Sequence, residues 1–478
     1  VSAYLKLSVG RDNTFLYESV QGGEVKGRYS IIGRDPDLIW RLKNGKAEIA
    51  RPQGAVVESD FAPAPDGDDP LASMRALVRA TRLTLPAGLP PMAAGLFGFL
   101  GYDVVRLVEH LPNVPPDTLG LPDATLVRPS LTAIFDNVRD EILLSAPVWP
   151  EAGVDAKVAY MRAAEALQCA ISDLEKPVPA PLSPPADVAG EMGAAPLSNM
   201  TKDEYFGMVA RAKEYIMAGD IFQVVPSQRF RRPFSLPPMA LYRALRRLNP
   251  SPYLYHLGFP GFAVVGSSPE ILVRLKDGIV TIRPIAGTRP RGRTPEEDER
   301  LAMELMNDPK ERAEHLMLID LGRNDVGRIA AVGDVKVTKS FFIERYSHVM
   351  HLVSDVEGHI RDGLDAVDAL AAGLPAGTLT GAPKIRAMEI IDEFEKEKRG
   401  GAYAGAVGYF AADGSMDMCI MLRTAVVKDG TMYVQAGGGI VADSVPESEY
   451  QESVNKSKAL MAAADEAVRY AREKYQLR

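Results

Sequence analysis

The chain has 478 residues, 46% of them hydrophobic, and carries 63 acidic against 55 basic side chains for a net charge of −8. This length and apolar content suffice for a large core divided among two or three domains. The acidic balance, without a concentrated basic stripe, argues against a general nucleic-acid binder. No apolar stretch is long enough to span a bilayer, and the two cysteines, Cys169 and Cys419, form no CxxC pair. A cytoplasmic, reducing location away from membranes is therefore expected.

Strand patterns dominate the first 176 residues, which we interpret as one region. Residues 1–7 alternate apolar and polar side chains, which predicts a strand rather than a signal peptide. Residues 14–19 and 27–33 also have strand patterns, and Asn44-Gly45 predicts a hairpin turn. Residues 93–102 space glycines three apart in apolar company. Because the lysine and hydroxyl residue of a phosphate loop do not follow, close backbone packing is the better explanation.

A proline-rich stretch over residues 177–199 predicts a linker to a second region, residues 200–478. Thr201 to Glu204 has the pattern of a capping box and predicts a helix that runs to about residue 219. Further along the chain, Asp-Gly pairs begin at residues 277, 413 and 429, each between strand-like segments. Repeated hairpins indicate antiparallel sheets, and the long helical stretches must cover their faces. The predicted fold class is α+β, with large antiparallel β-sheets and outer helices.

Two predicted helices in the second region carry carboxylates on one face. The first begins at Asp308, a candidate N-cap followed by Pro309. At helical spacing, the charged face holds Glu311, Glu314 and His315 on the first helix and Glu449, Glu452 and Lys456 on the second. Two such faces could close on one Mg²⁺, an ion held by carboxylates, water and substrate oxygens. Spacing alone favours the ordinary interpretation, two solvated charged helix faces.

Other polar or glycine-bearing segments stand at strand ends and turns of the second region. They are Glu270, residues 283–289, His351, the loop 375–384, Arg423 within an apolar strand, and residues 437–439. A glycine-bearing loop that enters a helix offers free N–H groups to anions, and a buried arginine needs an acid partner. Each segment also has an ordinary structural explanation, as a capped turn, a core histidine or an internal ion pair. Together they predict a magnesium-dependent site for a small molecule with more than one carboxylate.

Several of these motifs resemble those of the chorismate-utilising enzymes. The motifs are residues 308–315 with 320–325, 284–289, 376–384 and 435–444, and the resemblance covers residues 201–464. It implies the fold of that family, in which antiparallel sheets pack as a sandwich. It also implies that Glu314 and Glu452 ligate Mg²⁺, with Glu311 and Glu449 in support, so that the metal holds the ring carboxylate of chorismate.

The same resemblance implies roles for other residues of the site. Glu270 is expected to help the ring hydroxyl leave as a general acid, and His351 to transfer a proton during pyruvate elimination, with Thr378 beside them. The residues expected to contact the substrate are Gly287, Thr288, Tyr403, Arg423, Gly437, Gly438, Gly439 and Lys456.

Two positions favour one branch of the family. Ala286 stands where aminodeoxychorismate synthases carry a nucleophilic lysine, and Gln223 lies in the strand where isochorismate and salicylate synthases carry a lysine that activates water. Ammonia needs neither lysine, so the chain resembles the anthranilate synthase large subunit, which makes anthranilate and pyruvate in the first step of tryptophan biosynthesis. An aminodeoxychorismate or isochorismate synthase is the alternative within the enzymes. A silent ligand-sensing relative is the alternative outside them.

The first region resembles the tryptophan-binding part of that subunit at residues 17–24 and 27–30, with residues 249–253 as its second half. By this resemblance the inhibitor tryptophan would contact Glu18, Ser19, Pro252, Tyr253, Leu254, Val407 and Tyr409. The alternative is that Glu18 and Ser19 are ordinary strand-end residues. Neither cysteine has the context of a glutaminase nucleophile, so a separate glutamine amidotransferase subunit is expected to supply ammonia. The partner implies a hetero-oligomer, commonly a heterotetramer.

Overall fold

The computed structural model describes residues 1–21, 25–52, 54, 56–150, 153–179, 188–346 and 349–476. The strands that it describes pair antiparallel throughout: twenty of them form one continuous sheet, and β9 and β18 form a second. The predicted α+β class with large antiparallel sheets and outer helices is confirmed. In the described ranges, no helix is long and apolar enough to cross a membrane.

The strands are β1 (Thr14–Gln21), β2 (Val25–Lys43), β3 (Lys46–Ala50), β4 (Ala62–Pro63), β5 (Gly95–Leu100), β6 (Ala124–Asp136), β7 (Glu141–Ser145), β8 (Leu197–Ser198), β9 (Gln223–Val224), β10 (Ser227–Pro233), β11 (Tyr253–Phe259), β12 (Phe262–Ser268), β13 (Ile271–Lys276), β14 (Ile279–Ile282), β15 (Ile285–Pro290), β16 (Lys336–Arg345), β17 (Val349–His359), β18 (Gly381–Ala382), β19 (Ala406–Ala411), β20 (Met416–Ile420), β21 (Thr424–Lys428) and β22 (Thr431–Gly437). The helices are α1 (Ser2–Leu7), α2 (Pro70–Ala80), α3 (Ala156–Glu175), α4 (Val188–Glu191), α5 (Lys202–Met217), α6 (Pro238–Leu248), α7 (Pro295–Asn307), α8 (Pro309–Gly327), α9 (Ala366–Gly373), α10 (Lys384–Phe394) and α11 (Pro446–Gln476). Short 3₁₀ turns include η3 (Tyr102–Leu107), η4 (Gly377–Leu379) and η5 (Gly400–Ala402).

The strand pairing traces two arms that meet at the long strand β2, which pairs with both β1 and β6. The first arm runs β6, β5, β19, β20, β13, β14 and β17, and β17 also pairs with β15 and β16. The second arm runs β1, β11, β12, β21, β22, β10 and β8. Because β2 belongs to both, the chain can fold the arms over one another without breaking the sheet.

Aromatic side chains fill the space between the two arms. The rings of Phe15 on β1 and Phe97 on β5 stack with their centroids 4.5 Å apart, and Phe97 also contacts Tyr409 on β19. These residues belong to a buried cluster that draws on β11, β12, β20 and β21 as well. The arms therefore pack face to face as a sandwich.

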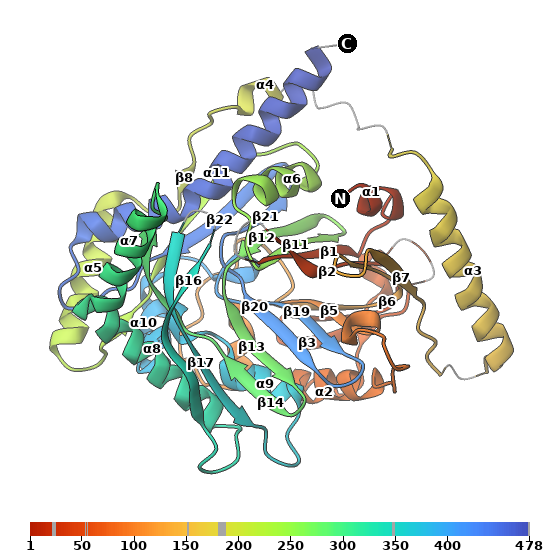
Figure 1. Ribbon diagram of the computed structural model, residues 1–478, viewed down its shortest axis with the longest axis horizontal. Helices are drawn as coiled ribbons and strands as arrows, with labels where there is room; N and C mark the ends of the chain where they lie inside the picture. Colours follow the sequence, from red (N-terminus) through yellow and green to blue (C-terminus); the bar gives the residue numbers. More distant parts are fainter. Residues whose placement is uncertain are drawn as a thin grey trace.

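Helices cover the outer faces of this sandwich (Figure 1). On the first arm, α2, α8 and α9 pack buried side chains such as Leu370 against Val273. On the second arm, α6 and α11 pack Leu241 and Leu460 into a cluster with Val434. The molecule is thus layered as helices, sheet, sheet and helices, while α3 lies along one side.

The predicted turns and caps are confirmed. Asn44-Gly45 joins β2 to β3, Asp277-Gly278 joins β13 to β14, and Asp429-Gly430 joins β21 to β22. Asn44, Asp277 and Asp429 have positive φ, which these turns require. Asp413-Gly414 lies in the turn between β19 and β20, where the glycine has the positive φ. Thr201 closes a capping box on α5, and Asp308 accepts hydrogen bonds from the first amides of α8.

Close packing at the glycines of residues 93–102 is also confirmed. Gly98 has φ +157°, and a Cβ there would lie 2.0 Å from the Thr125 carbonyl oxygen on the neighbouring strand. The glycine therefore lets β5 and β6 approach where a side chain could not fit.

The prediction of a strand over residues 1–7 is wrong, because these residues form helix α1. The same residues also fit a helix, because Tyr4 and Leu7 are three positions apart and both side chains are buried against the second arm. A six-residue segment can fit either the strand period or the helix period, and contacts with residues distant in sequence decide between them.

The division into residues 1–176, 177–199 and 200–478 remains a prediction. Strands from either side of the expected linker pair directly, β1 with β11 and β5 with β19. Within the linker, α4 and β8 lie in the described part, whereas residues 180–187 lie outside it, as do residues 22–24 of the predicted tryptophan motif.

Candidate active site

A cavity of about 200 Å³ is bordered by both arms, with β22 of the second arm in its lining, and we call it the small cavity. It gathers side chains from β15 and β17 of the first arm, from the turns between strands, and from helices α8 and α11. The predicted site residues that line it are Glu270, Gly287, Thr288, Glu314, His351, Thr378, Tyr403, Arg423, Gly439, Glu452 and Lys456. Gly437, Gly438, Glu311 and Glu449 stand outside this lining.

Glu270 follows β12, and its buried carboxyl group accepts one hydrogen bond from a side chain. The Thr378 hydroxyl donates to its Oε1 at 3.2 Å. Burial raises the pKa of Glu270 to about 8, against the opposing influence of Thr378, Arg423 and Lys456. A carboxyl group with this pKa keeps its proton at neutral pH and can serve as a general acid.

His351 on β17 has the properties of a base that could act beside this acid. Its Nδ1 lies 2.9 Å from the carbonyl oxygen of Gly287, and the Thr288 hydroxyl is 3.2 Å away. Because a carbonyl can only accept, Nδ1 carries the hydrogen and Nε2 keeps its lone pair. Burial lowers the pKa of His351 to about 4, so the ring is neutral at physiological pH and can accept a proton.

Arg423 lies in the connection between β20 and β21 with φ +47°, so its predicted place within a strand is wrong. The left-handed backbone interrupts the apolar pattern at this residue and turns the chain toward the cavity. In the described part of the chain, the guanidinium has no hydrogen-bond or ion-pair partner. Burial lowers the pKa of Arg423, and the field of Glu270 opposes that shift. The cation is thus available to a ligand carboxylate.

Two carboxylates from different helices face the small cavity, Glu314 from α8 and Glu452 from α11. Burial raises the pKa of Glu314, and the charges of Glu311 and Glu452 raise it further. Burial and Glu452 also raise the pKa of Glu449. The two helices therefore bring like charges together, and a cation between them would relieve the repulsion.

Two carboxylates of the acidic faces have ion-pair partners in the protein. Glu452 pairs with Lys456 at 2.7 Å, and Glu311 pairs with Arg289 at 3.1 Å. His315 is buried, with Nε2 2.7 Å from the Ser354 hydroxyl. Because residues 309–327 form helix α8, the i, i+3, i+4 spacing places Glu311, Glu314 and His315 on one side of the helix, as predicted. His315 lies in the core, however, and does not line the small cavity.

Among the described residues, no group of three or more His, Cys, Asp or Glu side chains is arranged to hold a metal ion. Glu314 and Glu452 form an oxygen-only pair, which fits Mg²⁺ because that ion usually takes one or two carboxylates and completes its shell with water and substrate. The residues present thus fit Mg²⁺ held jointly by protein and ligand.

Two glutamines were not among the predicted site residues yet line the small cavity. Gln223 on β9 is buried, and its Oε1 has no hydrogen-bond partner in the described part of the chain. Gln435 on β22 begins the glycine-rich motif at residues 435–444, and this adjacency is the signal that could have identified it. The Oε1 of Gln223 is therefore a buried acceptor that can take a hydrogen bond from a ligand.

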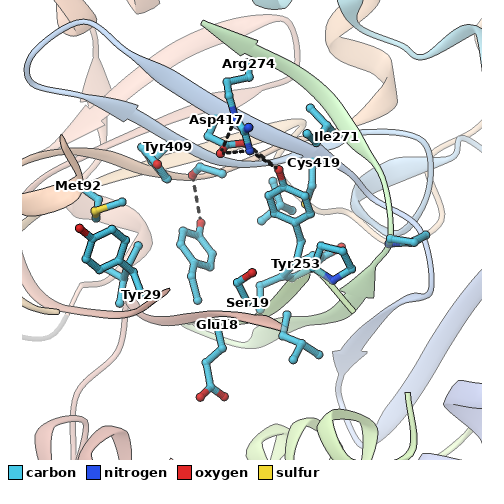
Figure 2. Close-up of a pocket in the computed structure, with 18 of the residues that line it drawn as sticks. Glu18, Ser19, Tyr29, Met92, Tyr253, Ile271, Arg274, Tyr409, Asp417 and Cys419 are labelled. Carbon is cyan, nitrogen blue, oxygen red and sulfur yellow. Dashed lines mark hydrogen bonds and ion pairs between the residues drawn. The ribbon is translucent and has the colours of Figure 1, made fainter. Parts of the chain in front are cut away.

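A second cavity, of about 470 Å³, lies between the arms and is called the large cavity. The seven residues predicted for tryptophan all line it: Glu18, Ser19, Pro252, Tyr253, Leu254, Val407 and Tyr409. Figure 2 shows Ser19 on the cavity side of its strand and Glu18 pointing away. The Glu18 carboxylate instead accepts hydrogen bonds from Tyr242 and Arg246, both at 2.6 Å.

An ion pair that the sequence did not reveal lies at one side of the large cavity (Figure 2). Arg274 and Asp417 lie 2.9 Å apart, and the Tyr253 hydroxyl donates to Asp417 at 3.0 Å. The two charged residues are on neighbouring strands, β13 and β20, and only that pairing brings them together. The cavity thus combines aromatic walls with a polar end, as suits an amphipathic ligand.

The two cavities share a wall. Pro269 lines both of them. Tyr346 lines the large cavity, and its ring packs edge to face on that of His351 with the centroids 5.4 Å apart. One layer of side chains therefore separates the two sites.

The sequence matches the family of chorismate binding enzymes over residues 24–462. Anthranilate synthase component 1 of Cereibacter sphaeroides is 57% identical over 474 residues, with 99% of this chain and 93% of the relative covered. The corresponding protein of Pseudomonas putida is 50% identical, with coverage of 97% and 92%. The crystal structure of anthranilate synthase component I from Streptococcus pneumoniae superposes with a TM-score of 0.76 at 38% identity, covering 91% of this chain and 92% of the other.

The chain belongs to the chorismate binding enzyme family. It is an enzyme of the chorismate-utilising type, and the resemblance to anthranilate synthase component 1 expected from its motifs is confirmed. The menaquinone-specific isochorismate synthase of Escherichia coli has the same fold at a TM-score of 0.68 and 20% identity, covering 96% of this chain and 91% of the other.

Proposed function

We propose that the protein is the large subunit of an anthranilate synthase, which converts chorismate and ammonia into anthranilate and pyruvate. The observation that carries the proposal is the pairing, in one small cavity, of a carboxyl group that keeps its proton with a neutral imidazole whose Nε2 can accept one. Environments that push two pKa values apart assign the acid and the base of a reaction. The relatives, at up to 57% identity, carry the same name.

In the proposed reaction, Glu270 gives its proton to the ring hydroxyl of chorismate, which leaves as water while ammonia forms the new C–N bond. The added nitrogen then releases a proton that can return to Glu270. His351 next removes the proton from the ring carbon that bears nitrogen, and the enolpyruvyl methylene takes a proton as its C–O bond to the ring breaks. Pyruvate leaves and the ring becomes aromatic. Arg423 and the backbone near Gly439 hold the enolpyruvyl carboxylate throughout.

Mg²⁺ bound by Glu314 and Glu452 would neutralise the ring carboxylate of chorismate next to the carbon that ammonia attacks. Glu449 and Glu311, on the same helix faces, would support the site through water. Lys456, which donates to the Gly437 carbonyl at 2.9 Å, would fix the end of the glycine-rich loop against α11.

Ammonia is the proposed nucleophile because the small cavity offers it an acceptor and has no lysine at position 286 or 223, where the related synthases carry one. Ala286 and Gln223 both line the cavity, and the free Oε1 of Gln223 can accept a hydrogen bond from ammonia. A separate glutamine amidotransferase subunit would supply that ammonia and form a hetero-oligomer with this chain. An aminodeoxychorismate or isochorismate synthase is the alternative, and product analysis separates the three.

Feedback inhibition by tryptophan is the proposed role of the large cavity. Its volume of about 470 Å³, its aromatic lining and the wall shared with the small cavity support this role. Inhibition requires that tryptophan favour a state with weaker binding of chorismate, a coupling typically worth about 1–3 kcal/mol.

The test is to incubate the purified chain with chorismate, Mg²⁺ and ammonium at alkaline pH, with and without tryptophan, and to quantify anthranilate and pyruvate. Anthranilate and pyruvate in equal amounts, suppressed by tryptophan, are expected. Isochorismate, salicylate or aminodeoxychorismate would contradict the proposed nucleophile or the elimination step. No turnover with ammonium or with a glutaminase subunit would contradict the enzymatic proposal itself.

A further inference from the structure

A buried ion pair lies behind the small cavity. Glu395 ends helix α10 and Arg399 precedes the turn η5, and their side chains are 4% and 1% exposed. The Arg399 Nη2 lies 2.7 Å from the Glu395 Oε1. A buried pair of this kind contributes little net stability, because desolvation offsets the attraction of the charges. Its other contacts therefore indicate what it does.

The remaining donors of Arg399 hold two segments of the cavity wall. Its Nη1 donates to the Leu379 carbonyl at 2.8 Å, and its Nη2 donates to the Val225 carbonyl at 2.7 Å. Leu379 and Val225 both line the small cavity. Leu379 directly follows Thr378, the residue whose hydroxyl donates to Glu270. The guanidinium thus bridges the loop beside the proposed acid and the segment after β9.

The same guanidinium lies against a third part of the wall. Its central carbon is 5.2 Å from the ring centroid of Tyr403 and 4.6 Å from that of Tyr102. A cation at this distance is attracted to the electron-rich face of an aromatic ring. Tyr403 lines the small cavity, so Arg399 also contacts this part of the wall.

Glu395 holds a fourth part of the wall. It accepts hydrogen bonds from the amide and hydroxyl of Ser227 at 2.9 and 2.7 Å, and from Gln435 Nε2 at 3.3 Å. Gln435 lines the small cavity and also donates to the Ser227 hydroxyl. The carboxylate thereby sets the position of the Gln435 side chain on β22.

We propose that Arg399 and Glu395 are positioning residues that hold four separate walls of the active site in register: Val225, Leu379, Tyr403 and Gln435. The pair touches neither substrate nor reacting atoms. It acts through the residues that do, and the inference rests on the proposed function. Displacing catalytic groups by about 1 Å can cost about 10²-fold in rate. Disrupting the Arg399–Glu395 pair should therefore lower kcat more than it weakens substrate binding.

Arg106 and Asp392 provide a matched control. This ion pair also anchors α10, with Nη2 2.8 Å from Oδ1, and is 18% and 3% exposed. Neither residue lines the small cavity, and the other partners of Arg106 are Asp103 and the Asn113 carbonyl. Substitution of Arg106 therefore disturbs the same helix without changing a bond to the cavity wall.

The experiment compares Arg399→Lys, Glu395→Gln and Arg106→Lys for thermal unfolding and for kcat and KM of anthranilate formation with ammonium. Lysine can still pair with Glu395, but its single ammonium cannot bridge both carbonyls and also stack on the rings as a planar guanidinium can. Arg399→Lys is expected to lower kcat by about 10²-fold with a much smaller change in KM. Arg106→Lys is expected to change the melting temperature similarly while kcat stays within about two-fold.

Glu395→Gln tests the other half of the pair and is nearly isosteric, so it covers the case in which Arg399→Lys does not fold. A lower kcat is expected here too, and the double variant should lose less than the product of the two single effects. If kcat in both single variants matches that of Arg106→Lys, the pair is only structural and the inference is overturned. If the unsubstituted chain makes no anthranilate, the proposed function fails instead.

Discussion

The proton on Glu270 makes the sharpest quantitative prediction. With a pKa of about 8, the carboxyl group is protonated in about 90% of molecules at pH 7, whereas at the ordinary value of 4.5 fewer than about 1% would be. Glu270→Gln removes the transferable proton but keeps the shape, and its amide oxygen can still accept from Thr378. Loss of a general acid typically costs about 10²–10⁴-fold in rate, or about 3–5 kcal/mol in the barrier. We expect kcat to fall by that factor with KM nearly unchanged.

The pH profile tests the sign of the same reasoning. Because the acid form of Glu270 is the active one, turnover should fall as pH rises through about 8, provided that free ammonia is held constant. In Glu270→Gln this alkaline decline should disappear from the residual activity. Glu389→Gln, a surface change on α10, is the control and should keep the parent profile. A decline near pH 8 that persists in Glu270→Gln would refute the assignment of the acid.

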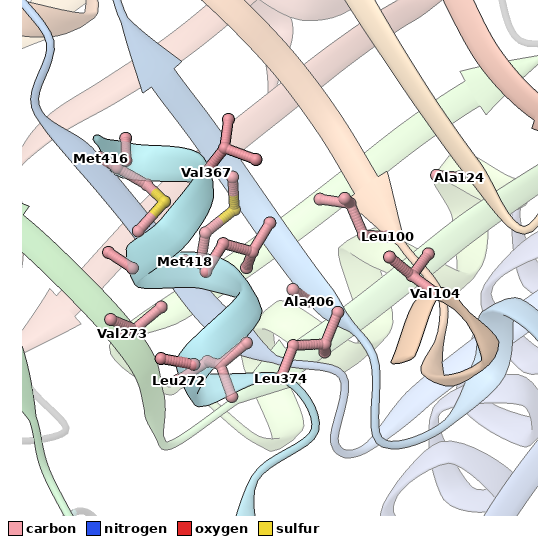
Figure 3. Packing of buried hydrophobic residues seen from close by; sticks show 14 of the residues in the cluster. Leu100, Val104, Ala124, Leu272, Val273, Val367, Leu374, Ala406, Met416 and Met418 are labelled. Carbon is pink, nitrogen blue, oxygen red and sulfur yellow. The ribbon is translucent and has the colours of Figure 1, made fainter. Parts of the chain in front are cut away.

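Three further predictions follow from other parts of the structure. Glu314→Gln or Glu452→Gln should weaken Mg²⁺ binding in calorimetry and abolish turnover without unfolding; Mg²⁺-dependent activity in both variants would remove the metal assignment. Ser19→Phe places a large ring in the large cavity, so tryptophan inhibition should be relieved while uninhibited turnover stays nearly intact; unchanged inhibition would move the sensor elsewhere. Met418→Ala, in the core beneath α9 (Figure 3), should cost about 2–5 kcal/mol in urea unfolding, and a loss below about 1 kcal/mol would contradict tight packing there.

Local chemistry explains what the sequence could predict. Asn44-Gly45 and the Asp-Gly pairs mark turns because they accept positive φ, and Thr201 and Asp308 mark helix starts because their side chains bind free amides. Residues grouped by family motifs, such as Glu270 and His351, were also placed together in the small cavity. In each case the signal lies within a few residues of the feature.

Features that depend on sheet pairing could not be predicted in this way. Arg274 meets Asp417 only because β13 pairs with β20, and Arg399 reaches Val225 only because the chain returns to the same wall after many residues. The apolar neighbours of Arg423 predict a strand there, and only its backbone conformation shows that the strands stop on either side of it. Burial and long-range partners, which no spacing pattern encodes, decide all three.

The shared wall gives the proposed regulation a short physical route. A ligand in the large cavity would contact Pro269, whose chain neighbour is Glu270, and Tyr346, whose ring lies on His351. The side chains of this shared wall cannot move aside without displacing their neighbours, because protein interiors have few voids into which side chains can move. A displacement of Tyr346 or Pro269 by tryptophan would therefore shift the proposed base or the proposed acid directly. On this view, inhibition should depend more on these two wall residues than on the periphery of the large cavity, where the Glu18 carboxylate is already bound by Arg246.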